Sequence, residues 1–135
     1  MPDPIELRPI GTVESELTDR ADAPKQADED APPAWIVLEP AYLDGLRGMQ
    51  PGTDLFVLTW LHEAERDILL VHSRGDLSRP ETGVFSVRSP VRPNPIGLHL
   101  TKVVEVDGNR VKVAALEAID GTPVLDLKPR LGDER

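Results

Sequence analysis

Gly-Val-Phe-Ser-Val-Arg-Ser-Pro-Val-Arg-Pro-Asn-Pro-Ile-Gly-Leu, residues 83–98, is the most informative stretch of the chain. It starts with a short apolar run of strand composition, then has three prolines within six residues, and then enters a second apolar run, residues 96–106. Proline fixes its own φ angle, lacks a backbone donor and biases the preceding residue towards extended geometry. The stretch therefore predicts an ordered, non-helical crossing between two strands, with Gly83 and Gly97 allowing close backbone approach or a positive φ at its margins.

The polar side chains of this crossing are candidates for a ligand site. Arg88, Ser89, Arg92 and Asn94 lie on a loop that the prolines make stiff, and rigid, convergent polar groups suit ligand binding. A proline-rich surface loop with two solvated arginines would have the same pattern. The residues alone do not choose between these two interpretations.

Length and composition bound the class of protein. A chain of 135 residues is long enough for one core but not for two, so residues 1–135 are expected to form a single domain. No apolar run of membrane-spanning length and no signal-peptide pattern occur, which favours a cytoplasmic protein without a membrane partner. Cysteine is absent, which excludes disulfides and thiolate catalysis, and the histidines lack the spacing of a zinc protease, so no metal is expected.

Charge is unevenly distributed along the chain. The net charge of −9 disfavours nucleic-acid binding, because polyanions are bound mainly by lysine and arginine. The acids concentrate in residues 17–33, a polar segment without periodicity that is predicted to be a long loop, whereas residues 74–95 have more basic than acidic side chains. The candidate ligand loop therefore belongs to the basic part of an acidic protein.

Short runs of β-branched and apolar residues predict six or seven strands. Asp107-Gly108, between two alternating runs, is a strong hairpin signal. Residues 40–49 place apolar side chains at helical spacing after a proline, which predicts one short helix. Many strands and few helices favour a small, single-sheeted, mostly antiparallel β-barrel, because closure removes exposed edges. The predicted strands are residues 5–15, 35–38, 53–62, 67–72, 98–106, 109–116 and 124–128, and residues 130–135 are a tail.

Familiar catalytic patterns are missing. The chain has neither of the glycine-rich fingerprints that bind dinucleotides or nucleoside triphosphates, and no Gly-x-Ser-x-Gly elbow. Asp120 and Asp126 are the best candidates for acid–base chemistry. Asp120 lies in a predicted turn, where an aspartate that caps its own backbone is the commoner explanation.

Two blocks together resemble a known family. Residues 83–98 and the block Asp-Gly-Thr-Pro-Val-Leu-Asp-Leu-Lys-Pro at 120–129 are similar to the TsaA-like family, which includes the TrmO-type tRNA methyltransferases. The likeness extends in the same order to Ile10-Gly11-Thr12-Val13-Glu14-Ser15, to Pro24-Lys25-Gln26 and to residues 53–62. It implies a β-barrel that binds S-adenosylmethionine without a dinucleotide-binding fold. Such barrels usually form homodimers and methylate an exocyclic nitrogen of threonylcarbamoyl-adenosine beside the tRNA anticodon.

The resemblance also implies which residues hold the cofactor. Adenine is bound by apolar faces and backbone groups, a carboxylate by donors such as Arg88, and a sulfonium by nearby oxygen atoms. Family members often carry Ser-His at the position of Thr53-Asp54, and serine at that of His99. The implied contacts are Ser15, Glu16, Leu17, Thr53, Asp54, Arg88 and Leu98, with main-chain groups of Glu117, Ala118, Ile119 and Asp120.

Substrate contacts are expected from the remaining polar residues of the same blocks. Arg92 and Asn94, displayed by the prolines, are predicted to contact phosphate or base, and Lys128 and Arg130 to add positive charge. Asp120 or Asp126 would accept a proton or orient the attacking nitrogen. The alternative function is a non-enzymatic S-adenosylmethionine-binding module, or a paralogue that methylates a different small molecule.

Overall fold

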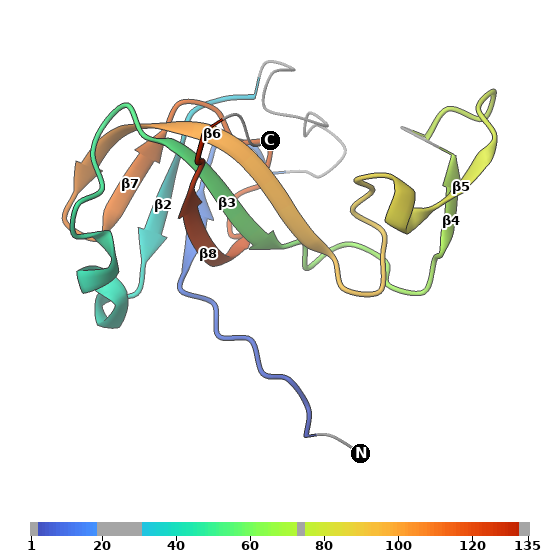
Figure 1. The fold of residues 1–135 in the computed structure, drawn as a ribbon, viewed down its shortest axis with the longest axis horizontal. Coiled ribbons are helices and arrows are strands. Elements are labelled where there is room, and N and C mark those ends of the chain that lie inside the picture. Colours follow the sequence, from blue (N-terminus) through green and yellow to red (C-terminus); the bar gives the residue numbers. More distant parts are fainter. Residues whose placement is uncertain (1–2, 19–30, 73–74, 133–135) are drawn as a thin grey trace.

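A computed structural model describes residues 3–18, 31–72 and 75–132 of the chain. Within these residues, six strands form a closed antiparallel barrel in the order β1-β2-β7-β6-β3-β8 (Figure 1). The predicted class, a small and mainly β antiparallel barrel, is confirmed. The barrel strands are β1 (Gly11–Glu14), β2 (Ala34–Leu38), β3 (Asp54–Trp60), β6 (Ile96–Asp107), β7 (Arg110–Val113) and β8 (Pro123–Pro129).

Strand β6 is long enough to pair with two neighbours in succession. Its first half pairs with all of β3, from Trp60 opposite Ile96 to Asp54 opposite Lys102. Its second half pairs with β7 through the two-residue turn Gly108-Asn109, which follows Asp107 and in which Gly108 has a φ of 59°. That turn confirms the predicted hairpin, since a two-residue hairpin loop needs positive φ angles. Closure is completed by the short pairing of β1 with β8.

The barrel core is built from alternate residues of the strands. Inward-facing positions of β2, β3 and β7 are almost fully buried, and their neighbours point outwards. This period of two is what a sheet with one buried face requires. The buried apolar cluster consists of Val13, Ala34, Ile36, Leu38, Leu46, Leu55, Val57, Val103, Val111, Val113, Leu116, Ala118 and Val124.

The helix predicted for residues 40–49 is a 3₁₀ helix, η2 (Pro40–Leu46), and not an α-helix. Only Leu46 of its apolar residues is buried, whereas Tyr42 and Leu43 are exposed. A short segment that buries one side chain gains little from packing, and α-helices depend mainly on tertiary packing for their stability. Helical spacing was present in the sequence, but a buried face was not.

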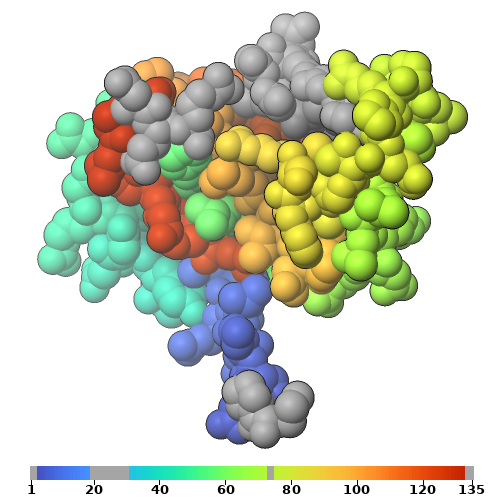
Figure 2. Space-filling view, turned by 45° about the vertical axis from the view of Figure 1, so that its right-hand side comes forward, coloured from blue at the N-terminus to red at the C-terminus, as the bar shows by residue number. Residues whose placement is uncertain are grey.

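A second, two-stranded sheet lies beside the barrel. It consists of β4 (Leu70–His72) and β5 (Glu81–Gly83), and Figure 1 shows it standing apart from the six barrel strands. In Figure 2 the yellow-green part of the chain, which contains this sheet, forms a lobe next to the orange and red strands. The sheet is joined to the barrel by residues 61–69 and by the proline-rich crossing.

The strand composition noted at the start of residues 83–98 was misleading. The strand, β5, ends at Gly83, and the apolar run itself forms a 3₁₀ turn, η4 (Val84–Ser86). Val84 is buried there and its amide donates to the carbonyl of Leu69, whereas Phe85 is 77% exposed. After this turn the chain crosses to β6 without further helix, as the prolines predict.

Part of the predicted loop 17–33 lies outside the described residues, as do Pro24-Lys25-Gln26 and Arg74. The described helices include none that is long and apolar enough to span a membrane.

Candidate functional site at one end of the barrel

Two segments that are far apart in sequence meet at one end of the barrel. We call it the β1 end: β1, β3 and β7 finish there, and β2, β6 and β8 begin there. Residues 15–17 follow β1 directly, and residues 117–120 lie in the connection that leads into β8. Because β1 pairs with β8, these two segments are neighbours.

Backbone hydrogen bonds join the two segments. The amide of Asp120 donates to the carbonyl of Leu17 at 2.6 Å, and the amide of Gly121 donates to that of Val13 at 2.7 Å. The carboxylate of Asp120 accepts a bond from the amide of Ser15 at 3.0 Å. Asp120 therefore ties β1 to the β8 connection across 105 residues of sequence, and does not cap its own turn as its local sequence suggested.

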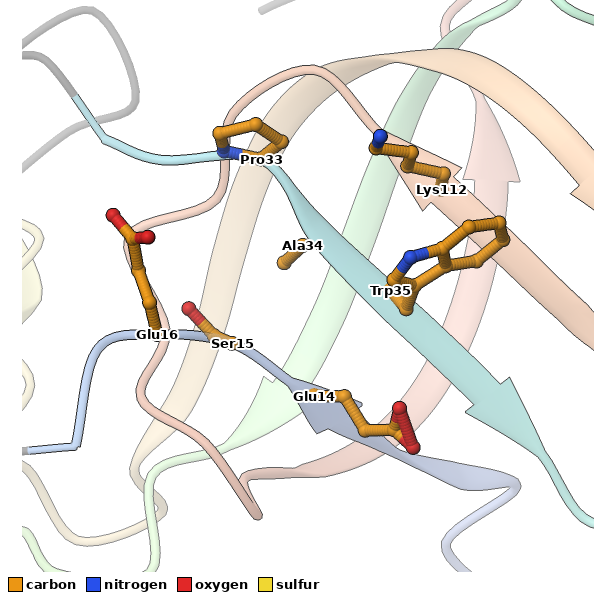
Figure 3. A pocket seen from close by; sticks show the side chains of 7 residues that line it. All are labelled: Glu14, Ser15, Glu16, Pro33, Ala34, Trp35 and Lys112. Atoms are coloured by element: carbon orange, nitrogen blue, oxygen red, sulfur yellow. The ribbon is translucent and has the colours of Figure 1, made fainter.

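A pocket of about 380 Å³ opens next to these segments (Figure 3). It is bordered by Ser15 and Glu16 on one side and by Pro33 and Ala34 on the other, with the indole of Trp35 projecting beside it. The chain that leads from β7 to β8 passes behind the pocket, and there the amide of Leu116 donates to the carbonyl of Pro32 at 3.0 Å. The pocket also includes Glu14 and Lys112.

Cationic side chains surround the indole of Trp35. The guanidinium of Arg110 lies 4.6 Å from its ring centroid, and the ammonium of Lys112 lies 5.9 Å away. Arg110 is fixed by a 2.9 Å ion pair with Glu14. Both cations face the ring, and Glu14 holds Arg110 in place. The indole of Trp35 is therefore fixed at the edge of the pocket, on the outer face of β1, β2 and β7.

Three side chains at the β1 end form a buried hydrogen-bonded row. His99 on β6 is 5% exposed; its Nε2 lies 2.7 Å from Oγ1 of Thr59 on β3, and its Nδ1 lies 2.6 Å from Oε1 of Glu117. Thr59 is fully buried, and 12% of the Glu117 side chain is exposed. The row fixes the carboxylate of Glu117 against the barrel wall.

One oxygen of this carboxylate has no partner. Oε2 of Glu117 is buried and makes no hydrogen bond in the structure, whereas Oε1 is occupied by His99. A buried polar atom without a partner costs free energy, and such groups concentrate at functional sites. This oxygen is therefore the clearest mark of a ligand contact at the β1 end.

The structure does not bring Thr53 and Asp54 to this site. Asp54 begins β3, and the amide of Arg130 donates to its carbonyl at 2.8 Å, so it lies beside the end of β8. Residues 117–120 precede the beginning of that same strand. Lys102 binds the Asp54 carboxylate at 2.9 Å, and this hydrogen bond and charge hold the pKa of Asp54 below its ordinary value.

Two residues predicted to contact the substrate, Lys128 and Arg130, lie near Asp54, at the end of the barrel opposite the β1 end. Asp126 lies in the middle of β8 and borders a different hollow of about 240 Å³, beneath η2. Of the two predicted acids, only Asp120 is at the β1 end.

The side chains of Arg92 and Asn94 make hydrogen bonds that hold the proline crossing in place. Nη1 of Arg92 donates to the carbonyls of Val87 and Ser89, each at 3.1 Å, and its guanidinium lies over the ring of Phe85. The side-chain oxygen of Asn94 accepts a bond from Arg66, whose Nε also donates to the carbonyl of Pro93 at 2.7 Å.

Sequence reasoning missed four side chains of this region: Trp35, Arg66, His99 and Glu117. The family resemblance implies only main-chain contacts for Glu117, and it marks His99 only as a departure from the family pattern. The signal that pointed to the row was Gly97. A Cβ at Gly97 would lie 2.4 Å from Thr59 Oγ1 and 2.6 Å from His99 Nε2, so a glycine is required beside this pair.

Comparison with known proteins finds relatives that cover most of this chain. A protein of Methanothermobacter thermautotrophicus named a probable S-adenosyl-L-methionine-binding protein is 44% identical over 129 residues, which are 96% of this chain and 92% of the relative. A protein of Archaeoglobus fulgidus named an S-adenosyl-L-methionine-binding protein is 43% identical over 122 residues, 90% of this chain and 86% of the relative.

Solved structures have the same fold. A crystal structure of TrmO from P. aeruginosa matches with a TM-score of 0.76 and 26% identity, and covers all of this chain and 61% of that protein. Another TrmO crystal structure matches with a TM-score of 0.77 and 26% identity over 98% of this chain and 63% of that one. The chain thus spans a little under two thirds of the TrmO chains it matches. The model of the tRNA-methyltransferase O N-terminal domain matches residues 12–133, and the chain belongs to that family.

Proposed function

We propose that this chain binds S-adenosylmethionine and transfers the methyl group to the exocyclic nitrogen of threonylcarbamoyl-adenosine beside the anticodon of a tRNA. The observation that carries the proposal is the family match over residues 12–133, which includes both segments that meet at the β1 end. A tRNA substrate is consistent with a cytoplasmic enzyme.

The residues of the β1 end fit the cofactor. It carries two cationic groups, an adenine and a ribose, and these need acceptors, an apolar face and backbone groups. The unpartnered carboxylate oxygen of Glu117 is a buried acceptor. The 380 Å³ pocket that Ser15, Glu16 and Trp35 border provides room for a nucleoside. Arg88 is exposed on the crossing and remains the proposed partner of the carboxylate, with Leu98 offering apolar surface on β6.

Thr53 and Asp54 do not enter the proposed site, because they lie at the other end of β8.

Methyl transfer asks little of the protein beyond alignment. Bound S-adenosylmethionine supplies a methyl group that its sulfonium already activates. The chain has to hold the attacking nitrogen in line with that methyl group and keep water away. Asp120 is the proposed proton acceptor, because its exposed carboxylate stands at the β1 end and is oriented by the Ser15 amide. Asp126 is too far along β8 to share this role.

The proline crossing is the proposed contact for RNA. Arg92 and Asn94 are held in place by their own bonds to the loop and to Arg66, so they form a preorganised polar surface and not freely moving donors. Preorganised contacts lose less conformational entropy on binding. Lys128 and Arg130, at the opposite end of the barrel, are proposed to meet phosphates of a different part of the tRNA or of one bound across a dimer.

A homodimer is the proposed assembly. The β4–β5 lobe and the neighbouring face of β6 expose large apolar side chains that no described part of the chain covers: Leu69 at 57%, Leu70 at 58%, Phe85 at 77% and Leu98 at 40%. A two-stranded sheet is marginally stable without packing on one face, and an exposed apolar patch marks an interaction surface. The partner proposed to pack against these apolar side chains is a second copy of the chain.

The function is tested in two steps. Calorimetry with S-adenosylmethionine measures cofactor binding. Incubation with labelled cofactor and two tRNA preparations, with and without the threonylcarbamoyl group, then measures transfer. Transfer to the modified tRNA alone is the expected result. Cofactor binding with no transfer to either tRNA would contradict the enzymatic part of the proposal.

A second candidate function is a module that binds S-adenosylmethionine without transferring its methyl group. Two observations favour it: the curated relatives above are named as binding proteins, and the basic residues predicted to hold RNA do not converge on one face of the chain. Under this alternative, calorimetry would give binding, and the labelled methyl group would stay on the cofactor with every tRNA tested.

A further inference from the structure

The Thr59–His99–Glu117 row can be assigned its hydrogen atoms by counting donors and acceptors. Thr59 Oγ1 has no second partner among the described residues. If His99 donated to it, the threonine hydroxyl hydrogen would be left buried and unused. If instead the hydroxyl donates to Nε2, then Nδ1 carries the hydrogen and donates to Glu117 Oε1, and every polar hydrogen of the row has an acceptor. In the second arrangement Nδ1 of His99 donates to Oε1 of Glu117, and Oε2 of Glu117 is the atom of the row that has no partner.

One oxygen of the Glu117 carboxyl group is therefore left without compensation. Apart from His99, no cationic side chain of the described residues is bonded to Glu117, and its Oε2 has no partner at all. Burying an ionised carboxylate without a partner is costly, so such a group is stabilised strongly by a cation or a charged donor. Oε2 is the oxygen of Glu117 that has no partner, so it is the atom that a ligand would contact. A single cationic group is the ligand that it suits.

We propose that the side chain of Glu117, positioned by His99 and Thr59, binds a cationic group of S-adenosylmethionine. The inference rests on the proposed cofactor and extends the main-chain contacts already assigned to residues 117–120. The cofactor has two cationic groups, its sulfonium and its α-ammonium. Each is a positively charged partner of the kind that Oε2 of Glu117 lacks. Reaching Oε2 requires the bound group to displace what now covers that atom.

Gly97 connects this row to the proline crossing. The glycine ends the block Arg92-Pro93-Asn94-Pro95-Ile96-Gly97, and only its missing side chain leaves room for Thr59 Oγ1 and His99 Nε2. His99 is a positioning residue here, because it acts on the ligand only through Glu117.

The test compares three ligands by calorimetry with the wild type and with Glu117→Gln. S-adenosylmethionine carries both cations, S-adenosylhomocysteine keeps only the ammonium, and 5′-methylthioadenosine has neither. Glutamine keeps the acceptor for His99 but replaces Oε2 by a donor. We expect its affinity for S-adenosylmethionine to fall by about tenfold to a hundredfold, the usual effect of one charged hydrogen bond, while 5′-methylthioadenosine binds as before.

The pattern of losses identifies the cation. A loss confined to S-adenosylmethionine indicates the sulfonium, and a loss shared with S-adenosylhomocysteine indicates the ammonium; either supports the inference. An equal loss for all three ligands, or no loss for any, would overturn it while leaving the proposed function intact. A wild-type chain that binds none of the three would overturn the cofactor assignment, and this inference with it.

Control variants separate binding from folding. Glu39→Gln removes the same charge from an exposed residue at the start of η2 and should change no affinity. Glu117→Asp keeps the charge on a shorter side chain, so it should retain the preference for cationic ligands even if overall affinity falls. Loss of that preference in Glu117→Asp, with thermal stability unchanged, would also contradict the inference. His99→Ala should weaken the preference less than Glu117→Gln does.

Discussion

At Gly97 the missing side chain determines what can be built next to it. The positions that a Cβ would contact, Thr59 Oγ1 and His99 Nε2, belong to buried side chains that are bonded to each other, so neither can move away freely. Overpacking of this kind usually costs about 1–3 kcal/mol.

We expect Gly97→Ala to lower the free energy of unfolding by about that amount and to weaken S-adenosylmethionine binding, because Glu117 loses its support. Chemical denaturation and calorimetry measure the two effects. Gly83→Ala is the matched control: nothing lies within 4 Å of its Cβ position and its φ is −63°. Equal stability of the two variants would show that the row does not depend on Gly97.

A second residue-scale prediction concerns Asp54. Its carboxylate is paired with Lys102, which lowers its pKa. A lowered pKa in the folded state stabilises the protein above the ordinary pKa of 3.8, and this contribution disappears as the pH falls through the folded-state pKa. Lys102→Met should therefore raise the pKa of Asp54, measured by carboxyl NMR titration. It should also lower stability slightly at pH 7, with the difference from wild type vanishing in strong acid. A difference that persists there would indicate a packing effect of Lys102.

Residue identity predicted the site only in part. Asp120, Ser15 and Leu17 were expected at the cofactor on family resemblance, and the structure brings them together. Asp54 was expected on the same ground, yet it lies at the far end of the barrel. Glu117 was expected only through its backbone, because its side-chain role depends on His99 and Thr59, whose proximity arises from the pairing of β3 with β6. Contacts between strands cannot be read from local patterns.

At the scale of elements, the proline crossing is held by side chains from outside it as well as by its own prolines. Arg66 precedes β4 and stacks 5.1 Å from the ring centroid of Trp60 while it bonds to Pro93 and Asn94. The amide of Leu61 in turn donates to the carbonyl of Pro95 at 2.8 Å. The end of β3 and the crossing therefore form one connected unit.

We expect Arg66→Ala to loosen this unit, because the Pro93 carbonyl and the Asn94 side chain both lose their donor. Hydrogen exchange of the Leu61 amide should become faster, and RNA binding weaker, with cofactor affinity nearly unchanged. Arg47→Ala is a suitable control, since that arginine is exposed and its ion pair is with the exposed Asp44 of η2. Unchanged exchange at Leu61 would show that the prolines alone hold the crossing.

The strands themselves were easier to predict than the turns between them. Strands β2 and β3 are short, nearly continuous apolar runs and β7 alternates, so all three were located to within a few residues. Residues 84–87 have the composition of a strand but turn instead, because Val84 is bonded to Leu69 and buried while Phe85 points outwards. The helix at 40–49 tightened to a 3₁₀ helix because it has almost no buried face to stabilise it.

At the scale of the whole molecule, the barrel and the lobe differ in how well they bury apolar surface. The barrel encloses a continuous cluster of valine, leucine and isoleucine side chains, whereas β4 and β5 have no buried residue in their strands. Composition and length predicted one domain with a single core. They did not predict that a two-stranded sheet would stand outside that core, because its apolar residues look like any other strand in the sequence.

The exposed leucines of the lobe give the last prediction. If a second copy covers this surface, Leu70→Asp places a charge in an apolar interface and should shift the protein from dimer to monomer, measured by size-exclusion chromatography with light scattering at several concentrations. Leu43→Asp, on the similarly exposed η2 helix, should leave the mass unchanged. Because Leu98 is one of these exposed residues and also a proposed cofactor contact, the monomer should also bind S-adenosylmethionine less tightly. A wild-type chain that stays monomeric at every concentration would contradict the dimer, and the leucines would then need a different partner.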